Sequence, residues 1–179
     1  MFAAILASLR ALVVLTAITS VAYPLAITGL AQVFFRDKAN GSLVTAGNQF
    51  VGSSLLAQKF TSPRYFWPRP SACDYGTVAS GASNQGFTSQ KLVDVVNDRR
   101  KTFGADAPAD LLYASGSGLD PHISPEAARY QIARVAGARH LPPEKVTALV
   151  EKSVEPPQLG FLGQSRVNVL LLNRALDRL

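Results

Sequence analysis

The sequence predicts one α+β domain behind a single N-terminal transmembrane helix. Residues 11–35 carry no formal charge, whereas residues 36–179 hold all twelve acidic residues and seventeen of the eighteen basic ones. Within 36–179, short apolar runs separated by Gly, Asn and Ser are followed by segments with helical spacing, a mixed α/β pattern. That length is enough for one domain with its own core.

The uncharged segment, "ALVVLTAITSVAYPLAITGLAQVFF", is long enough to cross a bilayer. A helix rises about 1.5 Å per residue, so roughly 20 apolar residues span the hydrocarbon core. Its polar members are mostly Ser and Thr, whose hydroxyls can bond to the helix's own carbonyls, and membrane helices tolerate a proline such as Pro24. The pairs Thr16/Ser20 and Ala22/Ala26 have the spacing of a helix-packing face. A cleaved signal peptide ending near Gly29-Leu30-Ala31 is the main alternative, and a buried soluble helix is a third interpretation.

Charge bias alone does not orient this helix. Arg10 and the α-amino group lie on one side, and Arg36 and Lys38 lie on the other. A short N-terminus before such a helix usually stays inside. We therefore predict a cytoplasmic N-terminus over 1–10, a transmembrane helix over 11–35 and an extracytoplasmic domain over 36–179. The single cysteine, Cys73, allows no internal disulfide and fits either compartment.

The first half of the domain is predicted in four segments. Residues 41–60 suggest strands and turns followed by a short helix. Residues 64–86, rich in Pro, Gly and Ser, suggest a long irregular segment that is either functional or a well-packed surface loop. A helix starts at Thr88 or Ser89 and stops at Gly104. The run "ADLLYAS", residues 109–115, is the best strand candidate.

The second half is predicted to be helical at three places. Ser124 has the position of an N-cap, with Pro125 at the first helical position and Glu126 in the first turn. Pro142-Pro143-Glu144 starts another helix in the same way. The last helix places four apolar residues on one face: Leu172, Ala175, Leu176 and Leu179.

The domain has a net charge of +5, with its basic residues scattered. The only basic run, Arg99-Arg100-Lys101, lies near a predicted helix end, where the helix dipole favours it. Aromatic and basic residues interleave only at "PRYFWPRP", residues 63–70. We therefore expect no nucleic-acid binding, and instead a mildly basic face toward phospholipid or an acidic partner.

The glycine-rich run Ser115-Gly116-Ser117-Gly118 does not match a P-loop, a Rossmann fingerprint or a hydrolase elbow. It lacks the lysine of a P-loop, Pro121 stands where a Rossmann motif needs its third glycine, and the order G-x-S-x-G is absent. Ser117, Asp120 and His122 are too close in sequence for a typical catalytic triad. Two histidines and one cysteine are a poor supply of zinc ligands. We predict no catalytic residue and no metal ligand.

Asp120 and His122 are better explained as parts of a turn. Asp120, next to a proline, is typical of an Asx turn. His122 is expected to hydrogen-bond within this turn and to fix the start of the helix capped by Ser124. A contact between His122 and a partner protein is the alternative.

Several segments together resemble a known family. They are "GSSLLAQKF", "YFWPRPSA", "SGASNQG", "SGSGLDPHISPEAARYQIARVA" and "RVNVLLLNRALD", in this order from Gly52 to Asp177. This series is similar to the C subunit of the Kdp potassium-transporting ATPase, a family that also has a single anchor. Ala82 and Gln85 depart from the family pattern, where glycine and leucine are expected, which affects local turn geometry only.

The resemblance implies an accessory subunit of the bacterial inner membrane. Its expected partners are a channel-like K⁺-binding subunit, a P-type ATPase subunit, a small peptide subunit and the lipid bilayer. The complex uses Mg-ATP and K⁺, but this chain is expected to bind no cofactor itself. One helix cannot enclose a selectivity filter, and the Asp-Lys-Thr-Gly-Thr phosphorylation motif of P-type ATPases is absent.

Two mechanisms are associated with the family. In one, the subunit raises the nucleotide affinity of the ATPase subunit, and Ser115, Gly116, Ser117 and Gly118 would contact the nucleotide. In the other, which we favour, the external domain caps or gates the ion entrance. The signature segments then supply candidate docking or structural residues: Arg69, Asn84, Asp120, His122, Ser124 and Glu126. A stand-alone periplasmic binding or enzyme domain is the remaining hypothesis.

Overall fold

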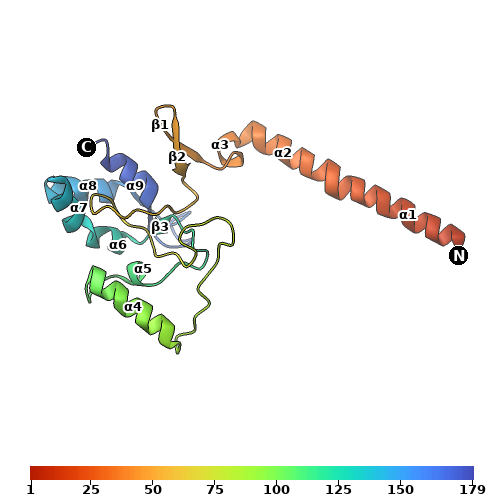
Figure 1. Cartoon of the computed structure of the whole chain (residues 1–179). Coiled ribbons are helices and arrows are strands. Elements are labelled where there is room, and N and C mark those ends of the chain that lie inside the picture. The colour runs from red at the N-terminus through yellow and green to blue at the C-terminus, as the bar shows by residue number, and fades with distance from the viewer. The chain divides into compact units, whose positions relative to one another are not determined.

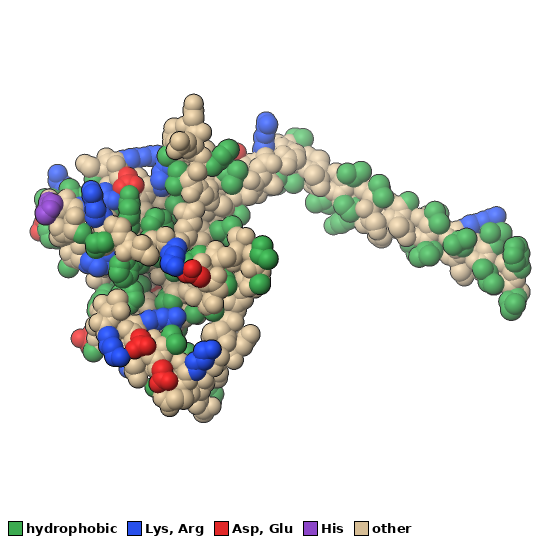
Figure 2. All heavy atoms as spheres, viewed as in Figure 1, with side chains coloured by type: hydrophobic (Ala, Val, Ile, Leu, Met, Phe, Trp, Pro, Cys, Tyr) green, Lys and Arg blue, Asp and Glu red, His purple; other side chains and the backbone are tan.

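The computed structural model describes all 179 residues, which form two compact units, Met1–Leu43 and Val44–Leu179. The first unit is dominated by one helix, long and apolar enough to cross a membrane, from Phe2 to Phe34. It comprises α1 (Phe2–Thr16), the π-helical segment η1 (Ala17–Ala22) and α2 (Tyr23–Phe34), and is followed by the short α3 (Arg36–Ala39). Hydrophobic side chains recur along the visible face of this helix (Figure 2).

The π-helical segment ends two residues before Pro24, which has no amide hydrogen to donate. Helices accommodate such interruptions with local π geometry. The Thr19 hydroxyl donates to the Leu15 carbonyl at 2.8 Å, the back-bonding predicted for the polar residues of this helix. No residue of these helical segments is buried against the rest of the chain.

The second unit is a mixture of helices and small sheets, which confirms the predicted fold class (Figure 1). It opens with a hairpin of β1 (Leu43–Ala46) and β2 (Gln49–Ser53). The later elements are α4 (Gln90–Phe103), α5 (Ala109–Leu112), β3 (His122–Ile123), α6 (Pro125–Tyr130), α7 (Ile132–Arg139), α8 (Pro143–Lys152), β4 (Val154–Glu155), β5 (Arg166–Asn168) and α9 (Val169–Leu176).

A three-stranded antiparallel sheet joins the segment around His122 to the C-terminal part of the chain. Its order is β3-β5-β4, with His122 opposite Asn168, and with Val167 paired to Ile123 on one side and to Val154 on the other. The last strand in sequence is therefore the central one. Helices α6 to α9 gather beside one another (Figure 1), and α8 packs on α6, α7 and α9.

The main core lies between this sheet and helices α6–α9. Its largest fully buried apolar side chains include Phe66, Leu111, Ile123, Leu172 and Leu176. A smaller cluster of Val96, Ala107 and Leu112 joins α4 to α5. Full burial of a Leu, Ile or Phe side chain contributes about 1.5–3 kcal/mol to the free energy of unfolding.

Phe66 is the one core residue of this size that comes from the long irregular segment. Two buried amides hold that segment by both backbone groups of a residue. Asn173 accepts from the Phe66 amide at 2.8 Å and donates to the Phe66 carbonyl at 3.0 Å. Gln131 does the same to Trp67, at 2.8 and 3.1 Å. These four bonds satisfy the backbone amide and carbonyl groups of two residues in an irregular segment, as pairing with a neighbouring strand would in a sheet.

Two of the three aromatic residues of "PRYFWPRP", Tyr65 and Trp67, pair with arginines of α7 and not with their basic neighbours in sequence. The Arg134 guanidinium lies 4.2 Å from the Trp67 ring centre, and that of Arg139 lies 4.9 Å from Tyr65. Burial lowers the pKa of Arg134 to about 10. The interleaved motif is therefore largely occupied by contacts within the domain.

The structure corrects three local predictions. Residues 109–112 of the predicted strand form α5, and no strand forms at 109–115. The helix expected before Phe60 is absent, because residues 54–60 are turn and irregular backbone held by the bond from the Ala57 amide to the Leu119 carbonyl. Leu179 is 58 % exposed beyond the end of α9, whereas Leu172 and Leu176 are buried as predicted.

Candidate functional site

The Ser115–Gly118 turn is packed against the loop that follows Arg69. The Ser115 amide donates to the Pro70 carbonyl at 3.1 Å, and the Gly118 amide closes the turn on the Ser115 carbonyl at 3.2 Å. Ser115 and Gly118 are buried, while Gly116 and Ser117 are exposed at the tip. The Ser117 hydroxyl accepts from the Leu119 amide at 3.1 Å. Only half of this turn is open to a ligand.

Gly118 is the residue at which the turn lies closest to the loop that contains Ser71 and Cys73. Its φ of +71° lies in the left-handed region, and a Cβ placed there would lie 2.6 Å from the Cys73 Sγ and 3.2 Å from the Ser71 Oγ. The Ser71 hydroxyl itself accepts from the amides of Cys73 and Tyr75, at 3.2 and 2.9 Å. A side chain at position 118 would therefore displace a hydrogen-bonded loop.

Next to this turn, Arg69 lies between two aspartates. Its Nη1 lies 3.2 Å from the Asp120 Oδ2, and its Nε lies 3.8 Å from the Asp110 Oδ1. The second contact is an ion pair but too long for a hydrogen bond, so the buried Nε has no hydrogen-bond acceptor. Tyr75 completes the arrangement by donating from its hydroxyl to the Arg69 carbonyl at 2.9 Å. Burial raises the pKa of Tyr75 to about 12, so the phenol stays protonated.

Asp120 forms the predicted Asx turn. Its Oδ1 accepts from the His122 amide at 3.0 Å, and the His122 Nδ1 lies 3.4 Å from the same oxygen. Burial opposes ionisation of Asp120, but the bonds from His122 and the charge of Arg69 outweigh it, so the pKa of Asp120 is lowered. His122 is thus held within the turn, as predicted.

The same cluster fixes the start of α6. The Ser124 hydroxyl accepts from the Ala127 amide at 3.1 Å, which confirms the predicted N-cap. The Ser124 amide in turn donates to the Asp110 Oδ2 at 2.7 Å. Glu126 is exposed in the first turn, where the helix dipole favours a carboxylate.

The structure therefore brings together four of the six predicted docking residues: Arg69, Asp120, His122 and Ser124. Glu126 borders this group on α6. Asn84 does not join it, and lies exposed in the loop before α4 with a φ of +51°. No group of three or more His, Cys, Asp or Glu side chains has a metal-binding arrangement.

Sequence reasoning missed Asp110, which links Arg69 to the cap of α6. Its role was not recognised because residues 109–115 were predicted to form a strand. Gln131 and Asn173 were also missed, although each is a polar residue within an amphipathic helical pattern. A buried amide on an apolar helix face is the signal that could have identified them.

Comparison with known proteins gives a consistent result. A family model described as KdpC, the K⁺-transporting ATPase c chain, matches residues 5–178. The potassium-transporting ATPase KdpC subunit of Dechloromonas aromatica is 53 % identical over 175 residues, which cover 92 % of this chain and 92 % of that protein. The corresponding subunit of Rhodospirillum rubrum is 56 % identical over 173 residues, covering 91 % of this chain and 89 % of the relative.

A more distant relative, the KdpC subunit of Serratia proteamaculans, is 48 % identical over 182 aligned positions, covering 96 % of each chain. These matches run through both the anchor and the domain, so they do not depend on the signature segment alone. They confirm the resemblance inferred from the sequence. The chain belongs to the KdpC family, the c chains of K⁺-transporting ATPases.

Proposed function

We propose that this chain is a non-catalytic subunit of an ATP-driven potassium uptake complex in the bacterial inner membrane. Its partners would be a channel-like K⁺-binding subunit, a P-type ATPase subunit and a small peptide subunit. Its domain would lie outside the cytoplasm and would cap or gate the external ion entrance. The names of its relatives and the single apolar helix support this proposal.

The observation that carries the mechanism is the packing of the Ser115–Gly118 turn. A nucleotide site in this turn would need backbone amides that point at the phosphates. Two of its four amides, those of Ser115 and Gly118, already donate within the domain. Ser115 is 3 % exposed, and Gly118 lies against Cys73. The turn is therefore better suited to hold two loops in a fixed shape than to bind a nucleotide.

The Arg69 cluster supports the same conclusion. Asp110, Asp120 and Ser124 all direct their side chains to partners in the domain. The hydrogen bonds of Asp110, Asp120 and Ser124 fix the geometry of the cluster within the domain, which favours a scaffold. A rigid surface of this kind suits docking, because little conformational entropy is lost on association.

The competing hypothesis is the nucleotide chaperone, for which the exposed Gly116 and Ser117 remain as contact points. A ligand that binds only the folded chain stabilises it by RT ln(1 + [L]/Kd), about 2.7 kcal/mol at a hundredfold excess over Kd. We expect the full-length chain in detergent to show no saturable melting shift with millimolar Mg-ATP. A saturable, nucleotide-specific shift that Ser117→Ala and Gly116→Ala remove would support the chaperone.

Two further measurements test the rest of the proposal. Protease added to spheroplasts, whose outer membrane is removed and whose inner membrane is intact, should cleave the domain, whereas a cytoplasmic domain would be cut only after the inner membrane is opened. Deleting the subunit should abolish potassium-stimulated ATP hydrolysis by the purified complex. Copurification of the chain from membranes without any transporter subunit would instead favour a stand-alone domain.

A further inference from the structure

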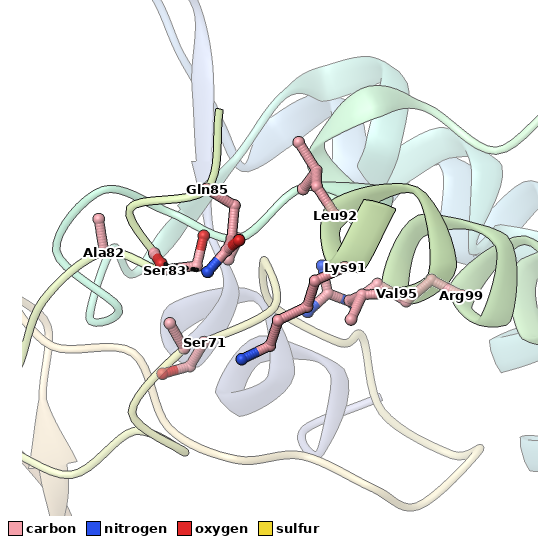
Figure 3. A pocket seen from close by; sticks show the side chains of 10 residues that line it. Ser71, Ala82, Ser83, Gln85, Lys91, Leu92, Val95 and Arg99 are labelled. Carbon is pink, nitrogen blue, oxygen red and sulfur yellow. Dashed lines mark hydrogen bonds between the residues drawn. The ribbon is translucent and has the colours of Figure 1, made fainter. Parts of the chain in front are cut away.

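A cleft of about 450 Å³ lies between α4 and the loop of residues 71–85. Figure 3 shows Lys91 and Arg99 reaching into it from α4, opposite Ser71, Ser83 and Gln85. The remaining lining is apolar, and no acidic side chain contributes to it. The only formal charges in this cleft are two positive ones.

Neither cation has a carboxylate partner. The Lys91 ammonium makes no ion pair or hydrogen bond, although Lys59 and Lys101 are both paired with aspartates. Two acidic side chains of α4 are engaged elsewhere: Asp94 accepts from Gln90, and Asp98 accepts from Lys101. Lys91 is thus left with unused donors at the cleft.

Arg99 is the more buried of the two cations. Its Nη1 donates to the Leu112 carbonyl at 2.5 Å, a neutral acceptor. Burial lowers the pKa of Arg99, because the positive charge is removed from water without a negative charge beside it. A carboxylate in the cleft would offset this cost.

The start of α4 adds to the positive potential. Its first turn contains no acidic residue, and the side chain of Ser89 does not cap it. Lys91 lies in this first turn, where the positive end of the helix dipole disfavours a cation. An anion from outside the chain would relieve both effects.

The surroundings point to a macromolecular partner. Val78, within the loop of residues 71–85, and Phe87, between that loop and α4, are 90 % and 92 % exposed. Exposed large apolar side chains on segments that flank a cationic cleft in sequence are consistent with a protein interface, in which aromatic residues and Arg are enriched. Leu92 and Val95 would contact the methylene groups of an acidic side chain whose carboxylate reaches the cations.

We propose that this cleft receives an acidic side chain, Asp or Glu, from another protein subunit. The inference rests on the proposed function, since it names a contact by which the domain docks within the transporter. Charge complementarity carries it: the cleft has two cations, no lining carboxylate and the apolar side chains of Leu92 and Val95. The docked carboxylate would accept from Lys91 and Arg99 together, with Ser71 and Gln85 as neighbouring polar groups.

The test uses the whole complex purified in mild detergent. Lys91→Glu places a like charge opposite the incoming carboxylate, so we expect affinity for the other subunits to fall about tenfold or more. The same change improves the first turn of α4, so the melting temperature of the full-length chain should not fall. This combination separates lost docking from lost folding. Lys145→Glu on α8, an exposed lysine without a side-chain partner, is the matched control and should leave assembly unchanged.

Zero-length carbodiimide coupling then identifies the partner group, because it joins an ammonium to a carboxylate in direct contact. We expect an amide between Lys91 and an Asp or Glu of another subunit, lost in Lys91→Gln. If Lys91→Glu assembles like the unaltered chain and no coupling occurs at Lys91, the cleft proposal fails while the proposed function stands. Saturable stabilisation by inorganic phosphate, abolished by Lys91→Glu, would also overturn it, since the cleft would then bind a small anion. Failure of the unaltered chain to copurify would refute the proposed function itself.

Discussion

Replacing Gly118 with alanine should disrupt the packing of the signature turn. The new Cβ would lie 2.6 Å from the Cys73 Sγ, 3.1 Å from the Gly81 carbonyl oxygen and 3.2 Å from the Ser71 Oγ. Two of these atoms belong to a hydrogen-bonded loop, so they cannot move independently of it. The φ of +71° adds a backbone penalty, because L-residues other than glycine avoid this region.

The magnitude follows from these two terms. The left-handed backbone costs about 1–2 kcal/mol, and overpacking a close-packed site costs about 1–3 kcal/mol. We therefore expect Gly118→Ala to lower the free energy of unfolding by about 2–5 kcal/mol. For a domain of this size, this corresponds to a melting temperature lower by roughly 5–20 °C.

Gly116 provides a matched control in the same turn. A Cβ there meets no atom within 4 Å, and its φ is not in the left-handed region. Gly116→Ala should change stability by no more than about 1 kcal/mol and could raise it. Thermal and urea unfolding of the full-length chain in detergent, followed by circular dichroism, measure both variants. Equal stability of the two alanine variants would refute the packing account of this turn.

Three other changes test separate parts of the structure. Ser124→Ala removes the cap of α6 and should lower the free energy of unfolding by about 0.5–2 kcal/mol, whereas Ser124→Asp should retain most of it; equal losses would contradict the cap. Leu25→Lys near the middle of the anchor should cost about 2.5–3.5 kcal/mol of insertion, measured as the membrane-integrated fraction, and unchanged insertion would argue against a transmembrane helix. Asp120 has a lowered pKa, so its ionised form stabilises the domain above the unfolded pKa of about 3.9, and this contribution is lost as pH falls through the folded pKa. Asp120→Asn should therefore be less stable than the unaltered chain near pH 7 and approach it below about pH 4 in acid unfolding curves; a constant difference would exclude Asp120 as the titrating group.

The sequence predicted those elements that have local signals. The cap of α6 at Ser124, the proline starts of α6 and α8, and the end of α4 at Gly104 were each visible from one to three neighbouring residues. The long N-terminal helix could be predicted because a long run of uncharged, mostly apolar residues is sufficient to indicate it. All of these depend on interactions within one turn or one helix.

The predictions that failed concern elements that depend on contacts between residues far apart in the sequence. An apolar run as short as "ADLLYAS" fits a strand or a helical turn equally well, and only packing against α4 and α6 determines which one forms. Strands β3, β4 and β5 contain two or three residues, too few for an alternating pattern. The candidate site joins Arg69 to Asp120 across 51 residues of sequence. Such a contact has no local signal, so the sequence supplied its members only through resemblance to a family.

The central position of β5 affects how the chain is made in the cell. The N-terminal helix is synthesised before the domain. The sheet lacks its middle strand until residues 166–168 have been synthesised. The hydrogen bond between the Phe66 amide and Asn173 can form only after a further 107 residues have been added. At about 5–20 residues per second, that interval lasts roughly 5–20 s. During this time the nascent domain exposes apolar residues that will later be buried. A chain that stops before Arg166 would keep its membrane helix but could never complete the sheet, so insertion alone does not report a folded subunit. A chain truncated before β5 should therefore be more susceptible to proteolysis than the complete domain.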